Sequence, residues 1–161
     1  MIRQNEDFQP KKVSESRAEL VDLILPPDTN QHGTIFGGKV MAYADKIAVI
    51  SAMRHCRQPV VTVRSDSFEF HAPIKAGEAI FVEACVVCAH RTSMEVLVKV
   101  QSENLLTGEK RLTSQAYLTM IAVDENGRPS PVPPLITETE EEKELYELAM
   151  ERYNARKRAG K

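Results

Sequence analysis

The hydrophobic pattern of this chain changes once, from helical periodicity to strand periodicity. Between residues 37 and 56, apolar residues cover nearly the whole circumference of a helix, which predicts a long helix enclosed on most sides. After Pro59 the pattern alternates every two residues, and the predicted strands are 60–70, 79–90, 93–103 and 110–123. Their links are too short for parallel crossovers, so we expect an antiparallel sheet.

The segments on either side of this region complete the organisation. A strand-like run within residues 14–25 stops at Pro26 and Pro27, and the polar sequence DTNQHGT then forms a turn cluster. A charged helix with acidic residues at its start and basic residues at its end closes the chain. We predict a flexible N-terminus over residues 1–13, one α+β domain over 14–126, a proline-rich arm over 127–138 and a C-terminal helix over 139–161.

One apolar helix beside a single sheet predicts that the sheet curls around the helix. Such a sheet leaves edge strands exposed, so pairing between subunits is expected. A narrow stripe on the charged C-terminal helix could dock on the domain or on a partner; it contains Leu145, Leu148, Ala149 and Arg152.

Composition excludes several classes of function. A net charge of −2 and an isoelectric point near 6.1 do not indicate nucleic-acid binding. No apolar run approaches the roughly 18 residues of a membrane span, and no signal peptide is evident, so we expect a cytoplasmic protein. On a regular strand Cys85 and Cys88 would point to opposite faces and could share a metal only if a bulge intervened. Because the sequence also offers no second ligand pair, we expect no metal site.

A lone acidic residue, Asp45, interrupts the apolar helix. Its neighbours on the helix surface are all apolar: Met41, Ala42, Ala48 and Val49. We expect these neighbours to desolvate the carboxylate, which would make it a better general base. The alternative is a structural ion pair with Lys46 or with a distant arginine.

The segment from Asp28 to Asp45, D-T-N-x-x-G-x-I-F-G-G-x-x-M-x-x-x-D, resembles the signature of the acyl-CoA thioesterases of the cytosolic acyl-CoA hydrolase type. The similarity continues through residues 60–74, 91–94 and 122–133. It implies a hotdog fold, an antiparallel sheet curled around a long buried helix, here with an added C-terminal charged helix. It also implies hydrolysis of acyl-CoA to a free acid and CoA, without metal or cofactor, by homodimers assembled into a trimer of dimers.

The resemblance places the active site between two subunits, with an asparagine from one and an aspartate from the other; Asn30 and Asp45 match these positions. Backbone amides at the start of the helix, with Gly38 as the assigned catalytic donor, would stabilise the oxyanion. Asp45 would activate water or attack the thioester directly, and the sequence does not separate these routes. The residues assigned to substrate or CoA binding are His32, Phe36, Gly37, Arg64, Lys75, Arg91, Thr92 and Ser93.

Two other functions would be compatible with an acyl thioester pocket at this position. A hydratase or dehydratase acting on acyl thioesters would need a histidine with an acidic partner, and only His32 could serve. A non-catalytic acyl-CoA sensor would keep the pocket without the groups that activate water.

Overall fold

The structure, a computed structural model, describes residues 8–160, and residues 1–7 and 161 lie outside the described part. The predicted order of elements is confirmed, with the long helix and the 60–70 and 93–103 strands at their predicted bounds. The helices and strands are β1 Lys11–Lys12, β2 Ala18–Leu23, α1 Gly37–Cys56, β3 Val60–Phe70, β4 Ala79–Ala89, β5 Ser93–Glu103, β6 Lys110–Ala122, β7 Leu135–Ile136 and α2 Glu140–Ala159. Two 3-10 turns, η2 Val13–Ser16 and η3 Pro26–Asp28, flank β2.

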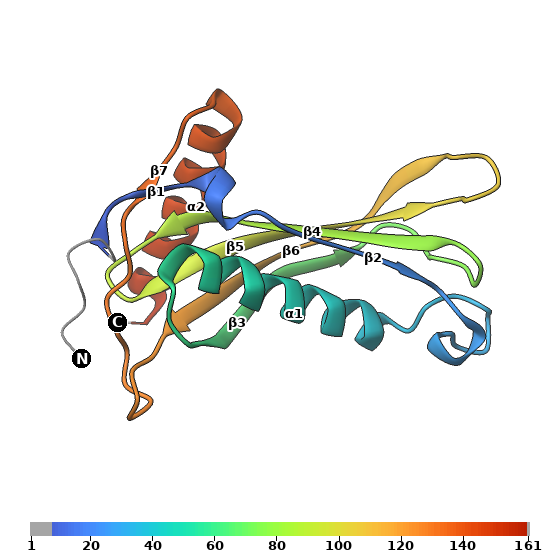
Figure 1. Ribbon diagram of the computed structural model, residues 1–161, viewed down its shortest axis with the longest axis horizontal. Coiled ribbons are helices and arrows are strands. Elements are labelled where there is room, and N and C mark those ends of the chain that lie inside the picture. The colour runs from blue at the N-terminus through green and yellow to red at the C-terminus, as the bar shows by residue number, and fades with distance from the viewer. Residues whose placement is uncertain (1–7, 161) are drawn as a thin grey trace.

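Five strands form one antiparallel sheet in the order β2-β4-β5-β6-β3. Figure 1 shows α1 running along one face of this sheet, while α2 packs against the opposite face. The α+β hotdog class expected from the sequence is therefore confirmed. In this order β2 and β3 are the two edge strands, so β3 presents an unpaired edge along most of its length.

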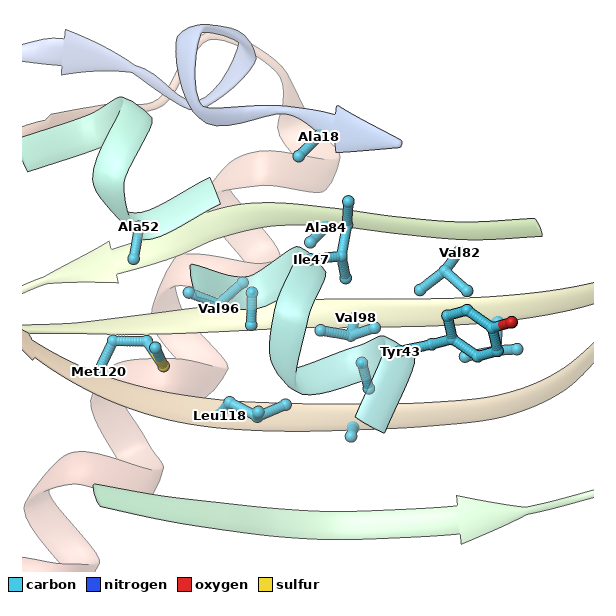
Figure 2. Packing of buried hydrophobic residues seen from close by; sticks show 14 of the residues in the cluster. Ala18, Tyr43, Ile47, Ala52, Val82, Ala84, Val96, Val98, Leu118 and Met120 are labelled. Atoms are coloured by element: carbon cyan, nitrogen blue, oxygen red, sulfur yellow. The ribbon is translucent and has the colours of Figure 1, made fainter. Parts of the chain in front are cut away.

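The main core lies between α1 and the sheet (Figure 2). Ile47 on α1 packs among side chains that alternate along the strands, including Val96 and Val98, which share one face of β5 as predicted. Burying one such aliphatic side chain stabilises the fold by roughly 2 kcal/mol. This packing fixes the position of α1 relative to the sheet.

The opposite face of α1 is not covered by residues 8–160. Met41, Ile50 and Met53 have exposed fractions of 45%, 44% and 41%, which is less enclosure than the sequence predicted. These side chains lie on one exposed surface of α1 together with Asp45 and Lys46, which are also exposed. We call this surface the open face of α1.

The C-terminal helix docks on the outer face of the sheet. Ala149 is fully buried against Val87 and Leu97, with Leu145 packed at the margin. Arg152 continues the predicted stripe by pairing with a buried glutamate of β5, but Leu148 is 46% exposed and does not belong to the contact.

The prediction that Cys85 and Cys88 point to opposite faces is wrong. A bulge shifts the β4–β5 register between Val86 and Cys88, so both cysteines pack in the cluster under α2. Burial raises the pKa of the Cys88 thiol to about 12, with the nearby Glu95 adding to the shift. Even so, residues 8–160 contain no group of three or more His, Cys, Asp and Glu side chains that could hold a metal ion. The expectation of no metal stays a prediction.

The N-terminal segment is tied to the proline-rich arm. β1 pairs in parallel with β7, which lies in that arm. Within η2, the hydroxyl of Ser16 donates a hydrogen bond to the carbonyl of Val13. The first seven residues of the predicted flexible segment lie outside the described residues, and the predicted domain boundaries stay predictions. Neither described helix has the length and apolar content needed to cross a membrane.

Candidate active site

The loop before α1 is shaped by the side chain of Asn30. Its Oδ1 atom accepts hydrogen bonds from the backbone N–H of His32 at 2.9 Å and of Thr34 at 3.3 Å. Gly33, at φ 73°, closes the turn through a 3.1 Å bond to the Asn30 carbonyl. Because the loop occupies Oδ1, and Nδ2 donates no hydrogen bond within residues 8–160, the Asn30 amide is available to an incoming ligand as a donor.

Helix α1 begins without a side-chain cap. The N-cap residue is Phe36, whose carbonyl accepts the N–H groups of both Lys39 and Val40, at 3.0 and 3.2 Å. The N–H groups of Gly37 and Gly38 have no acceptor among the described residues. These two donors and the positive end of the helix dipole therefore face whatever binds in front of α1.

A cavity of about 370 Å³ opens beside this helix start. Buried Val40 and Ile74 line it, and Phe70, which is 52% exposed, lies at its edge. A Cβ added to Gly37 would lie 3.4 Å from the Phe70 ring, whereas one added to Gly38 would meet open space. The cavity thus offers an apolar compartment next to the two unpaired N–H groups.

Asp45 lies on the open face of α1, at the boundary with β3. The hydroxyl of Thr62 donates a 2.6 Å hydrogen bond to Asp45 Oδ1, and within residues 8–160 no cation pairs with this carboxylate. The ion pair considered from the sequence is therefore not formed in the described chain. Nor do the apolar neighbours desolvate Asp45, because Met41 and Ala42 are themselves exposed.

Sequence reasoning missed Thr62. The signal available was one hydroxyl side chain between Val61 and Val63 on an otherwise apolar stretch of an edge strand. Only the packing of β3 against α1 shows that this hydroxyl reaches Asp45.

One chain does not bring all the predicted catalytic groups together. At the helical rise of 1.5 Å per residue, Asp45 lies about 12 Å along the axis from Gly37. Asn30, His32 and Phe36 gather with the glycines in front of α1, whereas Asp45 lies two turns further along. A site that contains both Asn30 and Asp45 at bonding distance therefore needs a second copy of the chain.

The residues assigned to CoA binding fall into three places. Lys75 forms a β-bridge with Thr34 near the start of α1, together with the His32 and Phe36 loop. Arg64 lies on β3 and donates a 2.8 Å hydrogen bond to Asp66. The third group is the β4–β5 turn, with Arg91, Thr92 and Ser93.

The imidazole of His32 is exposed and has no acidic partner in the part of the chain that the structure describes. The histidine and acid pair that a hydratase would require is therefore not formed around His32.

Comparisons with known proteins agree with this fold. The model of the thioesterase superfamily matches residues 32–109. An uncharacterised acyl-CoA thioester hydrolase of Bacillus subtilis, YkhA, is 47% identical over 143 residues, which cover 89% of this chain and 83% of the relative.

Solved structures are similar over nearly the whole chain. An apo-hexameric acyl-CoA thioesterase has a TM-score of 0.91 and 51% identity, covering 94% of this chain and 97% of that one. The acyl-CoA hydrolase of Staphylococcus aureus, solved with butyryl coenzyme A, coenzyme A and coenzyme A disulfide, has a TM-score of 0.86 and 38% identity, with coverage of 93% and 92%.

The Staphylococcus aureus enzyme has also been solved as three variants, in which an asparagine, an aspartate or a threonine is replaced by alanine. In that enzyme the aspartate follows the asparagine by 15 residues and precedes the threonine by 17. The family match and the 47% identity to YkhA over 89% of this chain show that it belongs to the acyl-CoA thioester hydrolases of the thioesterase superfamily.

Proposed function

We propose that this protein hydrolyses the thioester bond of acyl-CoA, to a carboxylic acid and CoA, at a site completed between two copies of the chain. The observation that carries the proposal is the Asp45 carboxylate, which is hydrogen-bonded by Thr62 and has no counter-ion within residues 8–160. Asn30, Asp45 and Thr62 have the same two sequence separations as the three residues replaced in the Staphylococcus aureus enzyme.

The start of α1 would stabilise the charge that develops in the reaction. When water attacks the thioester carbon, its carbonyl oxygen becomes an oxyanion, and the N–H groups of Gly37 and Gly38 could donate to it. A preorganised donor of this kind lowers the barrier by about 3 kcal/mol. Asn30 would add its Nδ2 donor, since its Oδ1 is held by the loop. The neighbouring cavity is our candidate for the acyl group.

Asp45 would act as the general base that accepts a proton from the attacking water. Thr62 bonds Oδ1, which leaves Oδ2 to accept that proton while the C–S bond breaks and CoA departs as the thiolate. A direct attack by Asp45, with a mixed anhydride as intermediate, uses the same atoms. In both routes the hydroxyl of Thr62 orients the carboxylate.

A second copy would supply what the single chain lacks. Asp45 adjoins the open face of α1, and the valines next to Thr62 on edge strand β3, Val61 and Val63, are exposed. Pairing of β3 with the β3 strand of a second copy would cover these side chains and exclude water from Asp45. We propose a homodimer, assembled further into a trimer of dimers, and the hexameric structural relative supports the higher assembly.

We propose that the reaction needs no metal and no cofactor, since CoA enters as part of the substrate and the described donors provide the charge stabilisation. The cytoplasmic location predicted from the sequence remains part of this proposal. Its basis is the sequence alone.

The test is the release of free thiol from acyl-CoA by the purified protein and by Asp45→Asn. The wild type should turn over acyl-CoA, and the variant should lose roughly 10²-fold or more of kcat, the size expected for removal of a general base. Circular dichroism and size-exclusion chromatography should be unchanged, because asparagine has nearly the shape of aspartate, can still accept the Thr62 hydrogen bond, and breaks no ion pair within residues 8–160. Full turnover by Asp45→Asn would refute the role of this residue, and tight binding of acyl-CoA without turnover by the wild type would favour a sensor.

A further inference from the structure

The C-terminal half of α2 lies against the β4–β5 turn, as Figure 1 shows at the end of the chain. The rings of Tyr153 on α2 and His90 stack with a centroid distance of 3.6 Å and an angle of 14°. A 2.8 Å bond from the N–H of His90 to the carbonyl of Ser93 closes the turn between them. The stack between His90 and Tyr153 therefore holds α2 against this turn.

The next turn of α2 contacts the edge strand. Arg156 Nη1 donates to Asp66 Oδ2 at 3.1 Å, and Arg64 Nε donates to Asp66 Oδ1 at 2.8 Å. Two guanidinium groups thus share one carboxylate, which leaves one positive charge uncompensated. The pairing also links α2 to the same strand that carries Thr62.

Further positive charge surrounds this point without acidic partners. Lys157 Nζ lies 4.6 Å from the centre of the Tyr153 ring, and neither Lys157 nor Arg91 forms an ion pair within residues 8–160. The pKa of His90 is lowered, mainly by burial and then by the charges of Arg156 and Lys157, so both cations act close to the turn. We call Arg64, Arg91, Arg156 and Lys157 the basic cluster.

We propose that the basic cluster binds the phosphate groups of the CoA moiety, so that α2 provides half of the CoA site. The inference rests on the function proposed above and extends it to residues of the C-terminal helix, which the sequence had not assigned to the site. Arg64 and Arg156 share the single Asp66 carboxylate, and Lys157 and Arg91 form no ion pair within residues 8–160, so the cluster has an excess of positive charge. Such an excess attracts an anion, and guanidinium groups suit phosphate oxygens. The hydroxyls of Thr92 and Ser93 add donors at the same turn.

The discriminating experiment compares acyl-CoA with acyl-pantetheine, which has the same thioester without phosphates. Lys157→Ala should lower the ratio of kcat/KM for acyl-CoA to kcat/KM for acyl-pantetheine roughly three- to fivefold, and Lys157→Glu more than about tenfold. Lys143→Ala removes a lysine from the other end of α2, where it pairs with Glu140, and should leave the ratio unchanged. An unchanged ratio in Lys157→Glu, or an equal loss on both substrates, would overturn the proposal.

Calorimetric binding keeps the test independent of turnover and identifies the source of the phosphate. CoA and adenosine 3′,5′-bisphosphate should bind the wild type competitively, with affinity that falls as salt is raised, and both should bind Lys157→Glu and Arg156→Gln several-fold more weakly. If the bisphosphate binds without displacing CoA, the cluster is a separate nucleotide site and the proposal is wrong. If the wild type hydrolyses neither thioester, the proposed function fails, while weaker CoA binding by these variants would still support the cluster as a CoA site.

Discussion

Thr62 on edge strand β3 and Asp45 on helix α1 are joined by a 2.6 Å hydrogen bond. The bond connects the helix that begins at the unpaired glycine amides to the strand at which a second copy is proposed to pair. Assembly would therefore act on the orientation of the carboxylate through Thr62, and not only through the exclusion of water.

Replacing Thr62 by valine keeps the shape of the side chain and removes only the hydroxyl. Hydrogen bonds to charged groups are worth about 1.5–3 kcal/mol, so kcat should fall roughly tenfold to a hundredfold in Thr62→Val. Thr62→Ser keeps the donor and should retain most of the activity. Steady-state kinetics with an acyl-CoA decides this, and an unaltered kcat in Thr62→Val would show that the bond has no part in the reaction.

The Gly38 amide can be removed by proline, which the first turn of a helix tolerates. Gly38→Pro should lower kcat roughly 10²-fold if this N–H stabilises the oxyanion. Gly38→Ala is the matched control, since it keeps the N–H and its Cβ would meet open space within the chain. Equal activity of the two variants, with equal melting temperatures, would exclude this amide from the oxyanion hole.

The docking of α2 depends on one buried acid. Glu95 is 2% exposed and receives two hydrogen bonds from Arg152, at 2.8 and 3.3 Å. Arg152→Ala would leave this carboxylate buried and unpaired, so the free energy of unfolding should fall by about 3 kcal/mol. Urea denaturation measures the loss. Lys143→Ala, which breaks only an exposed ion pair, should cost less than about 1 kcal/mol, and a similar small loss in both variants would contradict the account.

Two histidines should make the fold sensitive to acid. Burial lowers the pKa of His55, against the opposing bond to the Pro133 carbonyl, and burial followed by Arg156 and Lys157 lowers the pKa of His90. Below about pH 6.5 these histidines are protonated in the unfolded chain but still neutral in the folded chain. The free energy of unfolding therefore falls as the pH drops from about 6.5 toward the lower pKa values of the folded state.

Each histidine adds at most about 1.4 kcal/mol per pH unit to this slope. Urea denaturation of the wild type and His55→Gln between pH 7.5 and roughly 5 should show a shallower acid loss in the variant. Parallel curves would mean that His55 does not contribute.

The fold could be predicted from the sequence largely because its periodicities are long and separated by Pro59. The helical pattern over the 20 residues of α1 and the two-residue alternation of β5 are local signals, and packing in the folded chain does not change the elements that they predict. The faces of Cys85 and Cys88 could not be predicted in this way, because the bulge between Val86 and Cys88 depends on the packing of β4 against β5 and α2.

The candidate site was predictable where residues lie close together in the chain. Asn30 and the glycines of α1 belong to one short segment, whereas Thr62 meets Asp45 only through the packing of β3. The exposure of Asp45 was missed for a related reason. Helical neighbours such as Met41 are apolar, but no segment between residues 8 and 160 covers them.

The central claim, a thioesterase site shared between two copies, is tested most directly by mixing two inactive variants. Asn30→Ala and Asp45→Asn should each be inactive alone. Co-expressed with different affinity tags and isolated as mixed two-fold dimers, they should recover about half of the wild-type activity, because each mixed dimer regains one of its two sites. An unselected mixture from random pairing should recover about a quarter. Mixed assemblies that are isolated intact but release no thiol from acyl-CoA would contradict the shared site.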